Sequence, residues 1–107
     1  MEYTETIERM KGGRLYYCSD ERLQAEQMQR MDKVFAFNQL PPSHLEEKAA
    51  LLREMFAEIG ENCYLETPFF SNWGGKHVHF GNGVYANFNL TLVDDGDIYV
   101  GDRVMMG

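Results

Sequence analysis

The chain has little basic charge. Only 10 of its 107 residues are lysine or arginine, against 17 aspartates and glutamates, so the formal net charge at pH 7 is -7. A protein that binds nucleic acid needs a basic surface to neutralise phosphates, so this balance argues against a nucleic-acid partner. No run of residues is long and apolar enough to cross a membrane, and the first 13 residues lack the apolar core of a secretory signal. We therefore expect no membrane partner.

Cysteine is also scarce. Cys18 and Cys63 are the only two, and they form no C-x-x-C pair. This pattern predicts reduced thiols in a cytoplasmic protein and gives no indication of a metal site. What the chain does contain is 44% apolar and 13% aromatic residues, which is the composition of a folded globular protein. Its length leaves room for one small domain.

Helical patterns occupy the first half of the chain. We expect Thr4 to cap a helix that runs to about Lys11, and Ser19 to cap a second that runs to about Asn38. The apolar stripe of the second helix, expected to face the core, is formed by Leu23, Met28, Met31, Val34 and Phe35.

A third helix is expected after the Pro41-Pro42 break. Ser43 and Glu46 have the spacing of a capping box, in which each side chain caps the backbone of the other residue. The helix should run to about Glu58. His44 lies in its first turn, where we expect a solvated surface residue.

Residues 78–107 repeat at a period of six. Phe80, Ala86, Leu92 and Ile98 mark the repeat, which then slips by two residues after the acidic turn at 94–97. A period of six fits short strands joined by tight corners, as in a hexapeptide β-helix. The same spacing begins near Ile59 and is interrupted by residues 71–77. The sequence therefore predicts an α+β protein, with residues 1–58 helical and residues 59–107 in a β-helix that is incomplete at its C-terminus.

Several short motifs follow one another in a fixed order. They are GGRL at residues 12–15, Phe37-Asn38, Glu54-Met55-Phe56 before Ile59, Trp73-Gly74, and YANFN at residues 85–89 followed by Val93-Asp94-Asp95. Together they resemble the galactoside/maltose O-acetyltransferases, which are hexapeptide-repeat sugar acetyltransferases, over essentially all 107 residues. The resemblance implies a left-handed parallel β-helix after a helical segment, assembled as a homotrimer. It also implies acetyl transfer from acetyl-CoA to a sugar hydroxyl, in clefts between neighbouring subunits.

The resemblance also implies roles for individual residues. Asn87 matches a catalytic position that contacts the oxyanion of the transition state, and an amide N–H is a suitable donor there. Asn72, Tyr85 and Asp95 match positions that bind the acceptor, where a carboxylate can accept hydrogen bonds from sugar hydroxyls. A further acceptor contact falls near Cys18, whose thiol is a poor hydrogen-bonding group.

The general base of the family is a histidine one coil beyond Asp94-Asp95, and acetyl-CoA lies along later coils. The chain stops at Gly107, so we expect it to be the acceptor-side part of a longer protein, or a shortened relative, with no residue that binds acetyl-CoA. His77 and His79 alternate with Val78. If all three lie in a strand, both histidines should point outward, opposite Val78.

Structural alternatives exist for the same residues. Asn87 and Asn89 also suit strand corners, because asparagine tolerates left-handed backbone, and we expect this role for Asn89. Tyr85 also suits packing between subunits, and Asp94 suits a simple turn. Two functions stay open: a sugar O-acetyltransferase, and a non-catalytic trimeric sugar-binding or assembly module that lacks the base and the CoA-binding coils. A transferase with a non-sugar acceptor is a third possibility.

Overall fold

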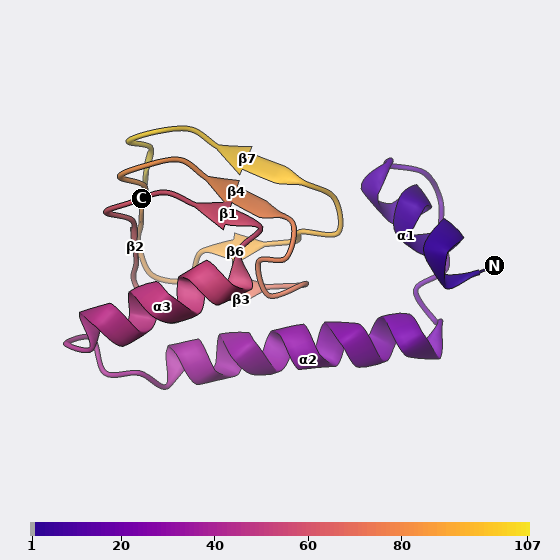
Figure 1. Cartoon of the computed structure of the whole chain (residues 1–107), viewed down its shortest axis with the longest axis horizontal. Coiled ribbons are helices and arrows are strands. Elements are labelled where there is room, and N and C mark those ends of the chain that lie inside the picture. Colours follow the sequence, from indigo (N-terminus) through magenta and orange to yellow (C-terminus); the bar gives the residue numbers. More distant parts are fainter. Residues whose placement is uncertain (1) are drawn as a thin grey trace.

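The computed structural model describes residues 2–107 and has helices first and strands after them (Figure 1). The helices are α1 (Tyr3–Lys11), α2 (Glu21–Asn38) and α3 (Leu45–Met55). The strands are β1 (Glu58–Ile59), β2 (Tyr64–Leu65), β3 (Phe70–Ser71), β4 (Val78–Phe80), β5 (Tyr85–Ala86), β6 (Thr91–Leu92), β7 (Ile98–Val100) and β8 (Met105–Met106). The predicted α+β class is confirmed. None of the helices in the described part of the chain has the length and apolarity needed to span a membrane.

The strands form three parallel sheets that the chain visits in turn. Their orders are β1-β4-β7, β2-β5-β8 and β3-β6. Ile59 pairs with Phe80, and Phe80 pairs with Val100, so each coil returns the chain to the same sheet one strand further on. This is the topology of a three-sided parallel β-helix. α3 lies at the β1 end of the stacked coils, and β7 lies farthest from it (Figure 1).

Two insertions explain where the six-residue spacing breaks. The paired positions are 21 residues apart in the first coil and 20 apart in the second. Beyond three hexapeptides, these spacings leave three and two extra residues. The extra residues lie in the loop of residues 71–77 and in the turn at residues 94–97, so the predicted slip of two is confirmed. The prediction that Ile98 continues the series of Phe80 is wrong, because the slip places Val100 opposite Phe80 and Ile98 opposite Val78.

Apolar side chains from the strands and from two helices fill the inside of the coils. The main core contains Val34 and Phe37 of α2, Leu52 and Met55 of α3, and Phe56, Leu65, Phe69, Val78, Phe80, Val84 and Ala86. The Phe56 and Phe80 rings meet edge to face, with centroids 4.9 Å apart. A smaller core of Met10, Leu23 and Trp73 joins α1 and α2 to the loop of residues 71–77.

The first two helices are not capped as predicted. α1 already begins at Tyr3, because the amide of Thr6 donates to the backbone oxygen of Glu2 at 2.9 Å. Thr4 therefore lies inside the helix, and its predicted capping role is wrong. α2 is capped by Asp20 instead of Ser19, since the Asp20 carboxylate accepts from the amide of Leu23 at 2.9 Å.

The third helix is shorter than predicted. Its N-cap is His44, and no side chain caps it, so the predicted capping box of Ser43 and Glu46 is wrong. The cause is a turn in which the amide of His44 donates to the backbone oxygen of Pro41. The helix ends at Met55. The side chain of His44 is exposed, as predicted, and lies 3.1 Å from Glu47.

The buried face of α2 differs from the predicted stripe. Leu23 and Val34 are buried, as predicted, together with Phe37. The other three residues of the predicted stripe are exposed: Met28, Met31 and Phe35. In their place, the inward face carries Gln27 and Arg30, whose polar groups bond to residues 72–74. The prediction failed because these polar side chains find partners inside the molecule.

Candidate functional site

Two of the predicted site residues meet where two paired strands end. Asn72 follows β3, and Asp95 lies in the turn after β6, the partner of β3 in the same sheet. The Nδ2 atom of Asn72 donates to Oδ1 of Asp95 at 2.5 Å. Both residues are half-buried. The fold therefore places an amide and a carboxylate side by side at a surface that remains open to solvent.

Two further residues hold this pair in place. Gln27 of α2 donates from Nε2 to the side-chain oxygen of Asn72 at 2.8 Å and to its backbone oxygen at 3.1 Å. The Tyr16 hydroxyl donates to Oδ2 of Asp95. Burial, followed by the hydrogen bond and charge of Asp95, raises the pKa of Tyr16 to about 12, so its hydroxyl keeps its proton at neutral pH. We call Tyr16, Gln27, Asn72 and Asp95 the Asp95 network.

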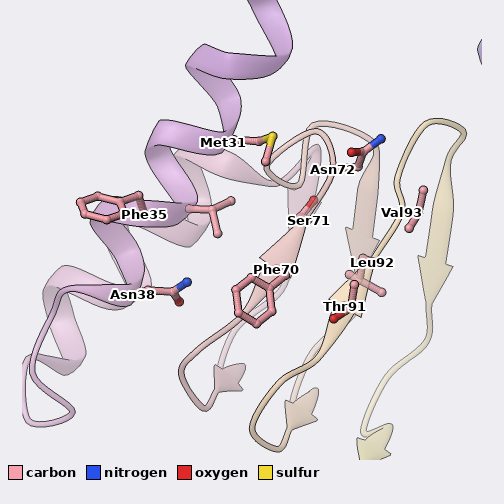
Figure 2. A pocket seen from close by; sticks show the side chains of 10 residues that line it. Met31, Phe35, Asn38, Phe70, Ser71, Asn72, Thr91, Leu92 and Val93 are labelled. Carbon is pink, nitrogen blue, oxygen red and sulfur yellow. The ribbon is translucent and has the colours of Figure 1, made fainter. Parts of the chain in front are cut away.

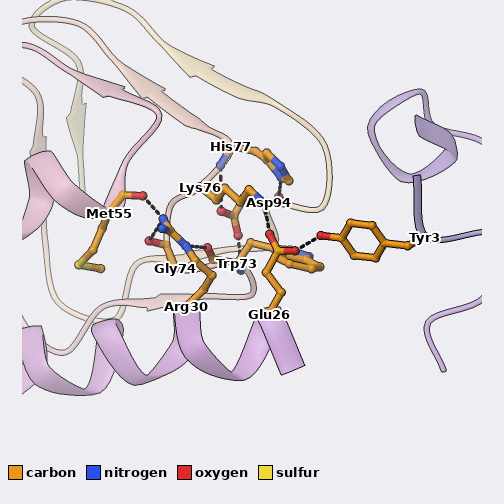
Figure 3. Close-up of polar contacts among 9 residues, drawn as sticks. All are labelled: Tyr3, Glu26, Arg30, Met55, Trp73, Gly74, Lys76, His77 and Asp94. Atoms are coloured by element: carbon orange, nitrogen blue, oxygen red, sulfur yellow. Dashed lines mark hydrogen bonds and ion pairs between the residues drawn. The ribbon is translucent and has the colours of Figure 1, made fainter. Parts of the chain in front are cut away.

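Asp94, the residue before Asp95, organises the loop that carries Asn72 (Figure 3). Its side chain is 0% exposed, and its carboxylate accepts from the hydroxyl of Ser71 at 2.7 Å, the amide of Trp73 at 2.7 Å and the amide of Gly75 at 3.1 Å. Its turn position is confirmed. The buried carboxylate is a structural role that the sequence did not indicate.

The loop also lies directly against α2 (Figure 3). Arg30 donates to the backbone oxygens of Met55, Trp73 and Gly74. Glu26 pairs with Lys76 and accepts from the hydroxyl of Tyr3, which ties α1 to the same place. Gly74 has a φ of +62°, and a Cβ there would lie 2.4 Å from the backbone oxygen of Arg30, so only glycine allows this close approach.

The two histidines of this region behave differently. His77 is buried, so the prediction that it points outward is wrong. It precedes β4 instead of lying in it, and its Nδ1 lies 2.7 Å from the backbone oxygen of Asp94, which can only accept. His79 is in β4 and lies on its outer side, as predicted, between Glu58 at 2.7 Å and Asp97 at 3.0 Å. Burial alone would lower the pKa of His79, but hydrogen bonds to Asp97 and Glu58 raise it overall.

Asn87 and Tyr85 lie at a different corner of the coil. They sit at β5, in the sheet β2-β5-β8. The Tyr85 hydroxyl donates to Glu66 at 3.3 Å, and its ring stacks on Tyr64 with centroids 6.4 Å apart. Asn87 is exposed, and its Oδ1 accepts from the amide of Phe88 at 2.8 Å, so the N–H groups of Nδ2 are the donors available to a ligand. Within residues 2–107, no hydrogen bond joins either residue to the Asp95 network.

An apolar groove opens beside Asn72, between α2 and the outer side of β3 and β6 (Figure 2). Its volume is about 360 Å³. Met31, Phe35, Phe70 and Val93 line it, and Phe35 is 67% exposed. The exposed side chains of Met31, Phe35, Phe70 and Val93 thus form an apolar surface beside Asn72.

The sequence did not indicate Tyr16 or Gln27. For Gln27, the pattern that could have done so is the helical spacing of Leu23, Gln27, Arg30 and Val34, which places two polar residues on the buried side of α2. For Tyr16, the preceding GGRL motif gives no indication of a partner in the β-helix.

Comparison with known proteins agrees with this architecture. Residues 9–60 match the family model described as the maltose acetyltransferase hexapeptide capping motif. The whole chain aligns with the galactoside O-acetyltransferase of Lactococcus lactis subsp. lactis (strain IL1403) at 49% identity over 107 residues, which is 52% of that protein. The chain thus spans about half the length of the curated relatives it matches.

Solved structures give the same result. A galactoside acetyltransferase in complex with coenzyme A matches with a TM-score of 0.82 and 37% identity, over 94% of this chain and 48% of that one. A maltose O-acetyltransferase from Clostridium difficile 630 matches with a TM-score of 0.88 and 28% identity, over 94% of this chain and 53% of that one. The chain therefore matches the maltose acetyltransferase hexapeptide capping motif and is similar over nearly its whole length to galactoside and maltose O-acetyltransferases, and its three helices and short parallel strands match the N-terminal part of those proteins.

Proposed function

We propose that the protein transfers an acetyl group from acetyl-CoA to a sugar hydroxyl, and that residues 2–107 supply the acceptor side of the site. The observation that carries this proposal is the hydrogen-bonded pair of Asn72 and Asp95 at the half-buried ends of two paired strands. A carboxylate accepts hydrogen bonds from hydroxyls, and an amide N–H donates to their oxygens, so the pair suits a sugar. The 49% identity to a galactoside O-acetyltransferase also supports a sugar acceptor.

The chemistry needs a base, an oxyanion donor and a positioned acceptor. The base removes the proton of the sugar hydroxyl, whose oxygen attacks the thioester carbonyl, and the tetrahedral intermediate expels the thiolate of CoA. We assign the oxyanion contact to the Nδ2 donors of exposed Asn87. We assign acceptor contacts to Asn72, Asp95 and Tyr85.

We assign the role of general base to the histidine that, by the family resemblance, is expected one coil beyond Asp94-Asp95. The three histidines of this chain are engaged elsewhere: His44 with Glu47, His77 with Asp94, and His79 with Glu58 and Asp97. Acetyl-CoA as co-substrate is supported by the related structure in complex with coenzyme A. No residue of this chain is assigned to its binding.

We further propose that the site forms in a cleft between the subunits of a homotrimer. Asn87 and Tyr85 lie at one corner of the coil and the Asp95 network at another, so residues of two copies together would surround one acceptor. The exposed apolar groove beside Asn72 supports contact between copies. The two free cysteines support a cytoplasmic location.

The test is acetyl transfer by the protein at its natural length. Release of free CoA is followed with acetyl-CoA and a galactoside, maltose or a non-sugar alcohol, and the product is identified by mass. We expect acetylated sugar, and no product from the alcohol. Sugar binding by calorimetry without any transfer would instead support the alternative, a non-catalytic trimeric sugar-binding or assembly module. If the protein neither binds a sugar nor transfers an acetyl group, both proposed functions are contradicted.

A further inference from the structure

Gln27 determines which way the side-chain amide of Asn72 faces. A terminal amide can be turned over, which exchanges its oxygen and nitrogen at almost no steric cost. Gln27 donates to both the side-chain oxygen and the backbone oxygen of Asn72, at 2.8 Å and 3.1 Å. Only the orientation with Nδ2 toward Asp95 satisfies this donor. One N–H of Nδ2 bonds to Asp95, which leaves the second N–H for a ligand.

Tyr16 fixes the other side of the pair. Its hydroxyl donates to Oδ2 of Asp95, while Asn72 donates to Oδ1, so each carboxylate oxygen has one donor within the chain. A carboxylate held at both oxygens cannot rotate freely, and each oxygen retains a lone pair for another donor. Tyr16 belongs to the segment that connects α1 to α2, and therefore links this segment to the β-helix.

We propose that Tyr16 and Gln27 are positioning residues that hold Asp95 and Asn72 ready for the vicinal diol of an acceptor. One hydroxyl of the diol donates to Asp95, and the oxygen of the neighbouring hydroxyl accepts the second N–H of Asn72. A monohydroxyl acceptor fills only one of these contacts. The inference rests on the proposed function, since it specifies how the same site recognises its acceptor.

The first test is Tyr16→Phe in the protein at its natural length, with a galactoside as acceptor. The phenyl ring keeps the packing and removes only the donor to Asp95. We expect the KM for the acceptor to rise about tenfold, which corresponds to about 1.4 kcal/mol. The kcat and the KM for acetyl-CoA should stay within about twofold, because a positioning residue for the acceptor does not touch the thioester. Tyr17→Phe is the matched control, since Tyr17 is 73% exposed.

The second test is Gln27→Glu, which keeps the shape of the side chain. A carboxylate at position 27 cannot donate to the oxygen of Asn72 and competes with Asp95 for the N–H groups of its Nδ2, so the amide is no longer held in one orientation. We expect the KM for the acceptor to rise about tenfold or more. Gln29→Glu on the same helix is the control for added charge, because Gln29 is exposed. Removing one hydroxyl of the diol from the acceptor should raise its KM by a smaller factor in both variants than in the unaltered protein.

The outcomes separate the inference from the function. An unaltered protein that transfers no acetyl group overturns the proposed function, and the inference with it. An active protein in which Tyr16→Phe and Gln27→Glu leave the KM for the acceptor unchanged overturns the inference alone. A fall in kcat and in the melting temperature together with a rise in both KM values indicates a merely structural role and also overturns the inference. If one variant fails to fold, the other decides.

Discussion

Replacing Asp94 by asparagine should destabilise the protein strongly. The buried carboxylate accepts hydrogen bonds from Ser71, Trp73 and Gly75. Asparagine has the same shape but offers one acceptor oxygen and one donor nitrogen, so at least one of these donors would face another donor. The loop of residues 71–77, which carries Asn72, would lose the group around which it is folded.

The expected loss is about 3–5 kcal/mol in the free energy of unfolding. A hydrogen bond to a charged group contributes about 1.5–3 kcal/mol, and a buried donor left without a partner costs about 1–3 kcal/mol more. The bonds from Ser71 and Trp73 share Oδ1 and can persist to the oxygen of asparagine, so the loss is that of the bond from the Gly75 amide, which would then face the amide nitrogen. The total is a large share of the roughly 5–15 kcal/mol that stabilises a typical domain.

The assay is urea denaturation followed by circular dichroism, with Asp97→Asn as the matched control. Asp97 lies three residues further on, and its side chain is 30% exposed and bonded to His79 and Lys11. Loss of such a surface ion pair should cost about 1 kcal/mol or less. Equal losses for the two variants would refute the account of Asp94 as the centre of the loop.

Two further predictions concern the outer surface. The pKa of His79 is raised, so its stabilising contribution is present below about pH 6.5 and is lost as the pH rises through the raised value. The pKa of Asp97 is lowered, chiefly by its hydrogen bond with His79. The stability that ionised Asp97 contributes is therefore present at neutral pH and is lost only as the pH falls through the lowered pKa. The urea midpoint of the unaltered protein should therefore exceed that of His79→Gln by more at about pH 6 than at about pH 9; a difference that does not depend on pH would contradict this. In the apolar groove, Phe35→Glu should dissociate the proposed trimer in sedimentation velocity, and an unchanged sedimentation coefficient would show that the groove is not an interface.

The fold follows closely from the sequence because its repeat is local. Each short strand needs one small or apolar residue pointing inward. The inward positions of successive strands are six residues apart, so Phe80, Ala86 and Leu92 show this spacing in the sequence itself. The corner at Asn89 is confirmed by its φ of +69°, which asparagine tolerates. Helix starts were less predictable: Thr4, Ser19 and Ser43 all have capping side chains, yet none of them caps its helix, because hydrogen bonds of neighbouring residues set where each helix begins.

The site depended on contacts between distant parts of the chain. Asn72 and Asp95 are 23 residues apart in sequence, and they meet because β3 and β6 are paired and each is followed by an insertion. Gln27 and Arg30 were missed because a polar residue on the buried face of a helix looks, in the sequence, like a break in the apolar stripe. Their partners are Asn72, Trp73 and Gly74 of the loop and the backbone oxygen of Met55, which only the folded structure brings against α2.

The most direct test of the account is the turnover of Asn87→Ala in the protein at its natural length. Loss of an oxyanion donor should reduce kcat by about 100- to 1000-fold, with the KM for the acceptor and the assembly state unchanged. Asn89→Gly is the control, because glycine accepts the left-handed backbone of that corner, and its turnover should match that of the unaltered protein. Unchanged turnover in Asn87→Ala would contradict the assignment of Asn87 to the transition state.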